Sequence, residues 1–277
     1  MNTKHPLAVP VKAGLETINK FHLRAETSLS DDIKFFEDFS GVLFSAHAPI
    51  DVSGQRVNIA AVNETLRDIS VERIKKYING CSFFPNVSQL NLHFGYKLFD
   101  GQKGDYDYHI DSIRNIAEHA ADYGIEIVME NLNSYWAVNG ISDDISWDEV
   151  DWEGKIEAFG MDSMEWIQMC LDVNRPNVSL CLDSSHVCTY AHRFSEDQRQ
   201  AKIEAFLSRP ELIKHVHWSD NYLYDSRGRS DSHLSVGKGT LPIEFHREIK
   251  SLDATILLEH FYSEEELEEE LLFIESL

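Results

Sequence analysis

The sequence predicts an α/β protein, a TIM (β/α)8 barrel with a shortened first β/α unit. Two observations lead to this fold. Eight short apolar segments alternate with helical patterns, and side chains that can bind metal follow six of those segments, from the third to the eighth. A chain of 277 residues, 43% of them hydrophobic, can bury the core that such a barrel needs, and no Pro/Gly/Ser-rich linker divides it. We therefore expect one domain over residues 1–277.

The eight expected strands are mostly continuous apolar runs without alternation, which is typical of parallel strands covered on both faces. The connection between the first two is too short for a full helix, and this is why we expect a shortened first unit. The strands are expected at residues 7–11, 21–26, 42–46, 87–92, 125–129, 178–182, 213–216 and 255–258.

Helical patterns separate these strands. The clearest covers residues 107–123, where apolar side chains share one face and Gly124 follows as a C-cap. Another runs over residues 62–79 and ends at Gly80. The glutamate-rich segment 264–275 is expected to form a terminal helix with its charges in solvent. A capping box of Ser263 and Glu266 would start that helix, and the side chains expected to face inward are Leu267, Leu271, Leu272 and Ile274.

An open, doubly wound sheet would show the same alternation, so we turn to the candidate metal ligands to separate the two folds. In a barrel, the C-terminal ends of many strands converge on one mouth, whereas an open sheet concentrates its site at a switch point. Ligands after six different strands favour the barrel. Imidazoles and carboxylates are the ligands that zinc, manganese and similar ions accept. The nine candidates are His47, His93, Glu130, Asp183, His186, His217, Asp231, His233 and Glu259.

Charge and composition argue against several other classes of protein. The net charge is −22, with 25 basic residues against 47 acids, so the chain should repel a nucleic-acid polyanion. No segment resembles a secretory signal or a membrane helix. The four cysteines include no C-x-x-C pair and are expected to be buried, reduced thiols, which fits a cytoplasmic protein.

Each candidate ligand also has an ordinary structural interpretation. A buried histidine is often only hydrogen-bonded within a core. The pair Asp183 and His186 could form a turn with a helix cap, and Asp231 with His233 could lie in a solvated loop. Their joint occurrence in order favours metal binding. The combination of Glu130, Asp183, His217 and Glu259 would give an oxygen-rich site with one imidazole, suited to manganese, magnesium or zinc.

The motifs around these residues resemble those of the xylose isomerase-like metal barrel superfamily. That superfamily includes endonuclease IV, a three-zinc phosphodiesterase of DNA repair, and many single-metal sugar isomerases and epimerases. The resemblance covers roughly residues 42–259. The motifs are Ser45-Ala46-His47-Ala48-Pro49, Asn91-Leu92-His93, Met129-Glu130-Asn131, Cys181-Leu182-Asp183-Ser184-Ser185-His186, His215-Val216-His217-Trp218-Ser219-Asp220, the segment from Gly228 to Gly239, and Leu258-Glu259.

The resemblance implies a metal-dependent isomerase or epimerase that acts on a small sugar or sugar phosphate. In the similar epimerases, the carboxylates that match Glu130 and Glu259 also exchange a proton with the sugar carbon. The cofactor would be a divalent metal, zinc or manganese, in one to three ions. An endonuclease IV-like phosphodiesterase is the first alternative, in which the other five candidates would complete two further metal positions. A non-catalytic barrel that binds metal or ligand is the second, and the oligomeric state stays open.

Substrate contacts are expected near the mouth of the barrel. The long loop at about residues 133–164 could act as a lid, and its Trp136 could stack on a sugar ring. Lys97, Arg229 and Lys238 could hold a phosphate or carboxylate of the substrate. Each of them is equally often an ordinary charged residue of the protein surface.

Overall fold

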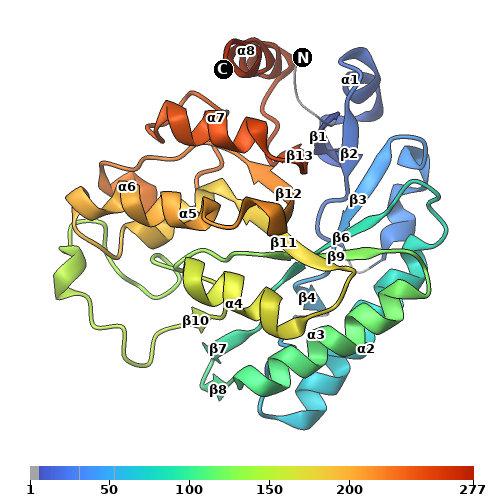
Figure 1. Ribbon diagram of the computed structural model, residues 1–277, viewed down its shortest axis with the longest axis horizontal. Coiled ribbons are helices and arrows are strands. Elements are labelled where there is room, and N and C mark those ends of the chain that lie inside the picture. Colours follow the sequence, from blue (N-terminus) through green and yellow to red (C-terminus); the bar gives the residue numbers. More distant parts are fainter. Residues whose placement is uncertain (1–5, 31, 53) are drawn as a thin grey trace.

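Eight parallel strands close into a barrel in the computed structural model, which describes residues 6–30, 32–52 and 54–277 (Figure 1). Around the barrel the order is β1-β13-β12-β11-β9-β6-β3-β2, and each neighbouring pair is parallel. The predicted barrel is confirmed. Its strands are β1 (Leu7–Pro10), β2 (Arg24–Glu26), β3 (Leu43–His47), β6 (Gln89–His93), β9 (Glu126–Glu130), β11 (Val178–Asp183), β12 (Ile213–Trp218) and β13 (Thr255–Leu258).

Helices surround the barrel, and the first connection is short as predicted (Figure 1). Between β1 and β2 the chain forms a 3-10 turn, Val11–Ala13, and the six-residue α1 (Leu15–Lys20), and the described residues between β2 and β3 form a 3-10 segment, Ile33–Phe39. Side chains of Asn, Asp or Ser begin most of the longer helices by accepting backbone N–H groups. The remaining helices are α2 (Glu64–Cys81), α3 (Tyr106–Ala121), α4 (Ser163–Val173), α5 (Ser184–Ala191), α6 (Glu196–Glu204), α7 (Ile243–Ser251) and α8 (Glu264–Ser276).

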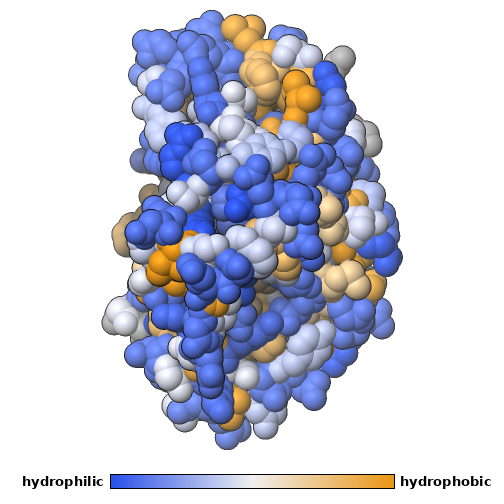
Figure 2. Space-filling model, turned by 90° about the vertical axis from the view of Figure 1, so that its left-hand side faces the viewer, coloured by the Kyte–Doolittle hydropathy of each residue, from blue (hydrophilic) through white to orange (hydrophobic). Residues whose placement is uncertain are grey.

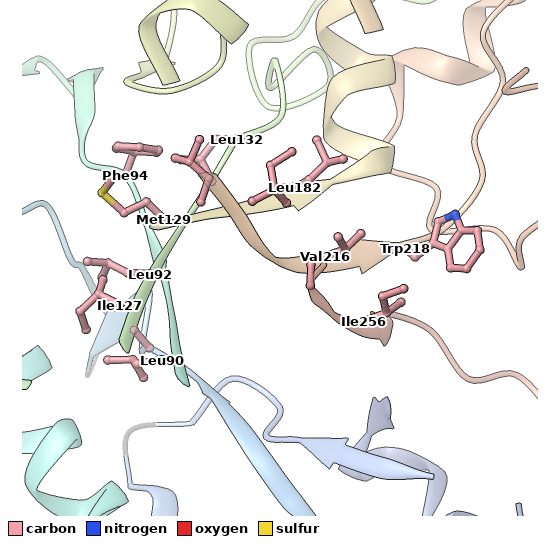
Figure 3. Packing of buried hydrophobic residues seen from close by; sticks show 14 of the residues in the cluster. Leu90, Leu92, Phe94, Ile127, Met129, Leu132, Leu182, Val216, Trp218 and Ile256 are labelled. Carbon is pink, nitrogen blue, oxygen red and sulfur yellow. The ribbon is translucent and has the colours of Figure 1, made fainter. Parts of the chain in front are cut away.

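Strand side chains alternate between the hydrophobic layer under the helices and the interior of the barrel. Leu90 and Leu92 of β6, and Ile127 and Met129 of β9, belong to the hydrophobic layer (Figure 3). The intervening residues have the opposite orientation, because successive side chains of a strand point to opposite faces. Glu130, next to Met129, therefore lies inside the barrel, and the same alternation directs the other strand-end ligands inward.

Much of the barrel interior is polar, which differs from the expected continuous apolar strands. Gln89 donates to Glu126, and Ser179 donates to the same carboxylate. Thr255 donates to the side-chain oxygen of Gln89 and lies 2.7 Å from Nδ1 of His215. Polar groups can be buried at low cost only when they find hydrogen-bond partners, and here they find one another. Most apolar side chains of these strands belong to the outward-facing layer.

The C-terminal helix α8 also departs from its expected pattern in two places. Ser263 caps it, and three of the four expected side chains are buried, but Leu272 is 61% exposed because it follows Leu271 by one position on the helix. Conversely, Glu270 is only 2% exposed. Its carboxylate accepts hydrogen bonds from the backbone N–H of Val236 and from Nε2 of His260. The helix therefore buries one charge instead of exposing all of them.

The molecular surface shown in Figure 2 is mostly hydrophilic, with apolar side chains in separate small groups. In residues 6–30, 32–52 and 54–277, every helix is too short or too polar to cross a bilayer.

Candidate metal centre

The barrel brings all nine candidate ligands to one mouth. His47, His93, Glu130 and Asp183 are the last residues of their strands, and Glu259 directly follows β13. The other four lie next to strand ends: His217 within β12, His186 in α5, and Asp231 and His233 in the loop between β12 and α7. The C-terminal ends of parallel strands meet at one face of a barrel, and this is why residues far apart in sequence converge.

The central group consists of Glu130, Asp183, His217 and Glu259, with one ligand atom from each lying within 4.8 Å of the others. Nδ1 of His217 is 3.6 Å from Glu130 Oε1, 4.0 Å from Asp183 Oδ2 and 3.0 Å from Glu259 Oε2. Each of these four atoms is buried, and none has a hydrogen-bond partner among the described residues. Buried polar atoms are rarely left unpaired, so four of them aimed at one point form a candidate cation site.

A second group lies beside the first and shares Glu130 with it. His93 Nε2 is 3.1 Å from Glu130 Oε2, and His47 Nε2 is 3.6 Å from the same oxygen. Nδ1 of His47 lies 2.8 Å from the backbone oxygen of Ala48, which fixes the ring and leaves Nε2 directed at the carboxylate. Two imidazoles and a carboxylate are a donor set that zinc accepts.

A third group shares Asp183 with the central one and adds His186 and His233. Asp231 lies between the two histidines: its Oδ2 is 3.0 Å from His186 Nε2, and its Oδ1 is 2.8 Å from His233 Nε2. Because Glu130 and Asp183 each belong to two groups, the nine side chains form one continuous cluster with three adjacent candidate positions.

Three carboxylates of the cluster, Glu130, Glu259 and Asp231, have a lowered pKa in spite of their burial. Burial by itself raises the pKa of Glu130, but the adjacent His93 and His217 hold that pKa well below its ordinary value. Burial likewise opposes the ionisation of Glu259, yet His217 and His233 lower its pKa to about 2. Both side chains thus present negative charge where a cation would sit.

Other members of the cluster hold protons. Burial, assisted by the charge of Glu259, raises the pKa of Asp183 well above normal. Burial lowers the pKa of His186, but Asp183 and Asp231 outweigh it and raise that pKa well above normal. Burial lowers the pKa of His93, in contrast to that of His186. In the absence of metal the cluster therefore carries protons that a divalent ion would displace.

Glu26 is a carboxylate at this mouth that the nine candidates do not include. It ends β2, is 1% exposed, and accepts hydrogen bonds from Ser45 at 2.5 Å and from Nε2 of His215 at 3.0 Å. Its second oxygen is 3.1 Å from Nε2 of His217. Although burial opposes ionisation, His217 and His215 hold the pKa of Glu26 far below normal. Glu26 thereby orients His217 so that Nδ1 faces the central group.

Neighbouring polar residues fix the backbone around the ligands. The side chain of Asn131 donates to the backbone oxygen of Asp183 and accepts from its N–H. Asp220 accepts backbone N–H groups from Gly237 and Leu241, which closes the loop that carries Asp231 and His233. Gly239 passes so close to Asp220 that a Cβ would lie 2.4 Å from its oxygen. The loop therefore needs glycine at that point.

The cluster forms the floor of a pocket of about 540 Å³, within the range that small ligands occupy. Tyr96 and Tyr135 line one side, with ring centroids 5.8 Å apart. Lys12 and Arg56 are the lysine and arginine among its described lining residues. Neither cation was a candidate in the sequence analysis.

The four expected substrate-binding residues lie elsewhere, and none is among the described residues that line this pocket. Trp136 is 1% exposed and donates to the backbone oxygen of Thr189. Arg229 stacks over Trp136, with its guanidinium carbon 4.4 Å from a ring centroid. These side chains therefore stabilise the loop instead of facing a ligand. The two lysines pair with glutamates on other segments: Lys97 with Glu165 and Lys238 with Glu269, both at 2.8 Å.

The long loop after β9 is held against the barrel rim. Trp152 packs against Trp136 at 5.0 Å between ring centroids, and Arg193 stacks on Trp152. Its strand β10 (Glu157–Ala158) joins an antiparallel sheet with β7 (Tyr96–Phe99) and β8 (Gln102–Lys103). Tyr135 is the part of this loop that reaches the pocket, together with Asn133.

Comparison with known proteins gives a family match and distant relatives. Residues 11–277 match the family model described as xylose isomerase-like TIM barrel. An uncharacterized protein of Methanocaldococcus jannaschii is 27% identical over 222 residues, which are 77% of this chain and 63% of that protein. The chain thus spans less than two thirds of that relative.

Solved structures of similar shape include a D-tagatose 3-epimerase-like protein and the IolI protein with a bound zinc atom. The first is 20% identical, with a TM-score of 0.67 over 98% of this chain and 99% of that one. The second is 15% identical, with a TM-score of 0.65 over 98% of each chain. At these identities the likeness concerns the fold.

Proposed function

Because the chain belongs to the xylose isomerase-like TIM barrel family, we propose that it is a divalent-metal-dependent isomerase or epimerase of a small sugar or sugar phosphate. The observation that carries this proposal is the central group: four buried, unpartnered ligand atoms of Glu130, Asp183, His217 and Glu259 within 4.8 Å of one another. Similar proteins of known structure include one titled as epimerase-like and one with bound zinc.

The residues present fit a metal of this kind. Three carboxylates and one imidazole give the oxygen-rich set that manganese, magnesium and zinc accept. Such an ion, when bound, polarises a carbonyl or hydroxyl of the substrate and so acidifies the adjacent C–H bond.

Within this reaction we assign the proton transfer to Glu130 and Glu259. Glu130 ends β9 and Glu259 follows β13, strands that lie on different sides of the barrel mouth, and both residues line the pocket. A carboxylate on each face of the sugar carbon could remove a proton from one side and return it from the other. The histidines around them hold both groups ionised, so that either can act as the base.

The first experiment compares the wild type with Glu130→Gln in deuterium oxide, after loading with manganese. A panel of aldoses, ketoses and their phosphates is followed by NMR for deuterium incorporation at carbon. We expect exchange with at least one substrate and its loss in the variant. Absence of exchange with every substrate would overturn the proposal.

A second function has its own supporting observation, the two groups that flank the centre. An isomerase of this kind needs one metal, whereas His47 and His93 on one side and His186, Asp231 and His233 on the other offer ligands for two more. Three adjacent cations suit phosphoester hydrolysis, because they can activate a water molecule and stabilise the leaving oxygen.

Metal content separates the two functions. Elemental analysis of protein purified without chelators should give about three zinc ions per chain for the hydrolase and about one ion for the isomerase. EDTA-sensitive cleavage of an abasic-site duplex or of a generic phosphodiester would support the hydrolase. Absence of cleavage at full metal loading would exclude it, and a chain that binds metal without either activity would be a binding module.

A further inference from the structure

Two positively charged side chains on the pocket wall have no role in the proposed reaction. Lys12 follows β1, and Arg56 lies in the connection that follows β3. In the barrel, β2 lies between β1 and β3. The two cations therefore come from either side of the end of β2, where Ser28 also lines the pocket. None of the nine candidate ligands belongs to β1 or β2, and the carboxylate at the end of β2 is Glu26, which is held by Ser45 and His215.

Neither cation is neutralised by the protein. Of the carboxylates in the described ranges, none forms an ion pair within 4.0 Å of Lys12 or Arg56. The chain has 47 acidic residues against 25 basic ones, so carboxylates that could pair with a basic side chain are numerous. Lys97 and Lys238, for example, each form an ion pair with a glutamate. Unpaired cations at the edge of a concave site suggest a ligand of opposite charge.

Arg56 is held in position without the use of its N–H groups. Its guanidinium carbon lies 5.4 Å from the ring centroid of Phe99 and 5.9 Å from that of Tyr96, which also lines the pocket. Contacts with aromatic faces stabilise the cation and leave its N–H fork available for a planar or tetrahedral anion. Lys12 is exposed, so its ammonium can adjust to such a ligand.

We propose that Lys12 and Arg56 bind an anionic group of the substrate, a phosphate or a carboxylate. Lys12 and Arg56 are the lysine and the arginine among the described residues that line the pocket, so they set the place of such a group on their wall. The rest of the molecule would then extend over the metal centre. The identity of that remainder as a sugar rests on the proposed function, whereas the anion site is argued from the two cations.

Calorimetric titration of the manganese-loaded protein tests this with D-ribose 5-phosphate, D-ribonate and D-ribose. We expect at least one anion to bind more tightly than ribose by about tenfold or more, since a charge-assisted hydrogen bond has an effect of this size. Lys12→Gln and Arg56→Met should each remove most of the preference and leave ribose binding unchanged. The methionine keeps an apolar stem against Phe99 and Tyr96, and Lys12 is exposed, so neither change threatens the fold. Preference for the phosphate over ribonate, or the reverse, identifies the anion.

Lys76→Gln is the matched control, because Lys76 is an exposed lysine of α2 outside the pocket and loses the same charge. It should retain the full preference. Equal binding of all three ligands by the wild type overturns the proposal, and so does a preference that survives in both pocket variants, which would assign the anion to the metal. The titration measures binding and needs no turnover, so the two proposals can fail separately. If the pocket variants lose the anion preference but the wild type shows no deuterium exchange, the isomerase proposal fails and the anion site stands.

Discussion

The barrel has two unlike sectors, and the difference between them separates metal binding from the rest of the site. The metal sector comprises β3, β6, β9, β11, β12 and β13, whose ends and following loops carry all nine candidate ligands. The N-terminal sector comprises β1 and β2 with their connections and contributes Lys12 and Glu26 to the pocket. The candidate metal ligands belong to the first, whereas the second provides a carboxylate that contacts one of them and a cation of the pocket lining.

The sectors also differ in how they are covered. Strands of the metal sector are followed by helices such as α2 and α3, whereas the N-terminal sector has α1 and a 3-10 segment. With little helical cover of its own, this sector relies on other parts of the chain. Thr17 of α1 donates to Glu264 of α8, and Glu26 of β2 contacts His217 of β12. A barrel can thus specialise one arc of strands for catalysis and stabilise the other arc through distant contacts.

The largest effect is expected in the metal sector, at the residue shared by two ligand groups. Glu130→Gln should lower kcat/KM by about 10³-fold, because it removes both a metal ligand and a proton-transfer group. Steady-state kinetics with elemental analysis would measure this. Glu126→Gln is the matched control, since Glu126 lies at the opposite end of the same strand, where its carboxylate accepts hydrogen bonds from Gln89 and Ser179. Equal losses in both variants would show that the effect is structural.

The next effect tests whether the N-terminal sector supports the metal sector. Glu26→Gln should weaken metal affinity by about 10- to 100-fold, the usual loss when the partner of a metal-binding histidine is removed. Competition with a chelating dye would measure the affinity. Ser45→Ala removes another hydrogen bond to Glu26 but leaves the contact with His217 intact, so it should change affinity much less. Unchanged affinity in Glu26→Gln would mean that the two sectors act independently.

Metal binding should become tighter as pH rises. Asp231 and Glu259 outweigh the effect of burial and raise the pKa of His233 to about 10, so this ring is protonated at neutral pH in the metal-free protein. A ligand must lose its proton to bind, and affinity should therefore increase about tenfold per pH unit for each displaced proton, until the pH passes that value. Calorimetry in buffers of different ionisation enthalpy would count the protons released. A pH-independent affinity would contradict this assignment of charge.

The smallest effect concerns the attachment of α1. Thr17→Val removes the 2.9 Å hydrogen bond to Glu264 and should lower the free energy of unfolding by about 0.5–1.5 kcal/mol, without changing kcat. Urea denaturation would measure the change. Ser276→Ala, which removes an exposed hydrogen bond within α8, should have less effect. A fall in kcat in Thr17→Val would show that the N-terminal sector is coupled more tightly to the metal than we infer.

The sequence predicted the features that depend on strand ends. Eight apolar segments, with nine candidate ligands placed in order along the chain, were enough to predict the barrel. They also predicted that His47, Glu130 and Glu259 converge at its mouth. Glu26 ends a predicted strand in the same way, so the same rule could have identified it. The alternation of Gln89 and Asn91 with leucines could also have revealed the polar interior.

The pocket cations could not be found in this way. Lys12 lies in the 3-10 turn Val11–Ala13 and Arg56 in the two-residue strand Gln55–Arg56, and elements this short have no periodicity that shows the direction of a side chain. Lys97 and Lys238 were more conspicuous beside the ligand motifs, but each pairs with a glutamate that lies far away in the sequence. A long, flexible side chain takes its direction from such partners, and they become known only when the chain is folded.

The C-terminal helix matters to anyone who shortens or tags this chain. The carboxylate of Glu270 accepts hydrogen bonds from His260 and from the backbone N–H of Val236. His260 directly follows the candidate ligand Glu259, and Val236 lies three residues after His233. Glu264 of the same helix accepts a hydrogen bond from Thr17 and pairs with Lys20, both residues of α1. Trimming α8, or pulling on it with a bulky fusion, would therefore disturb both a metal ligand and the first helix, although the segment looks like a dispensable acidic tail.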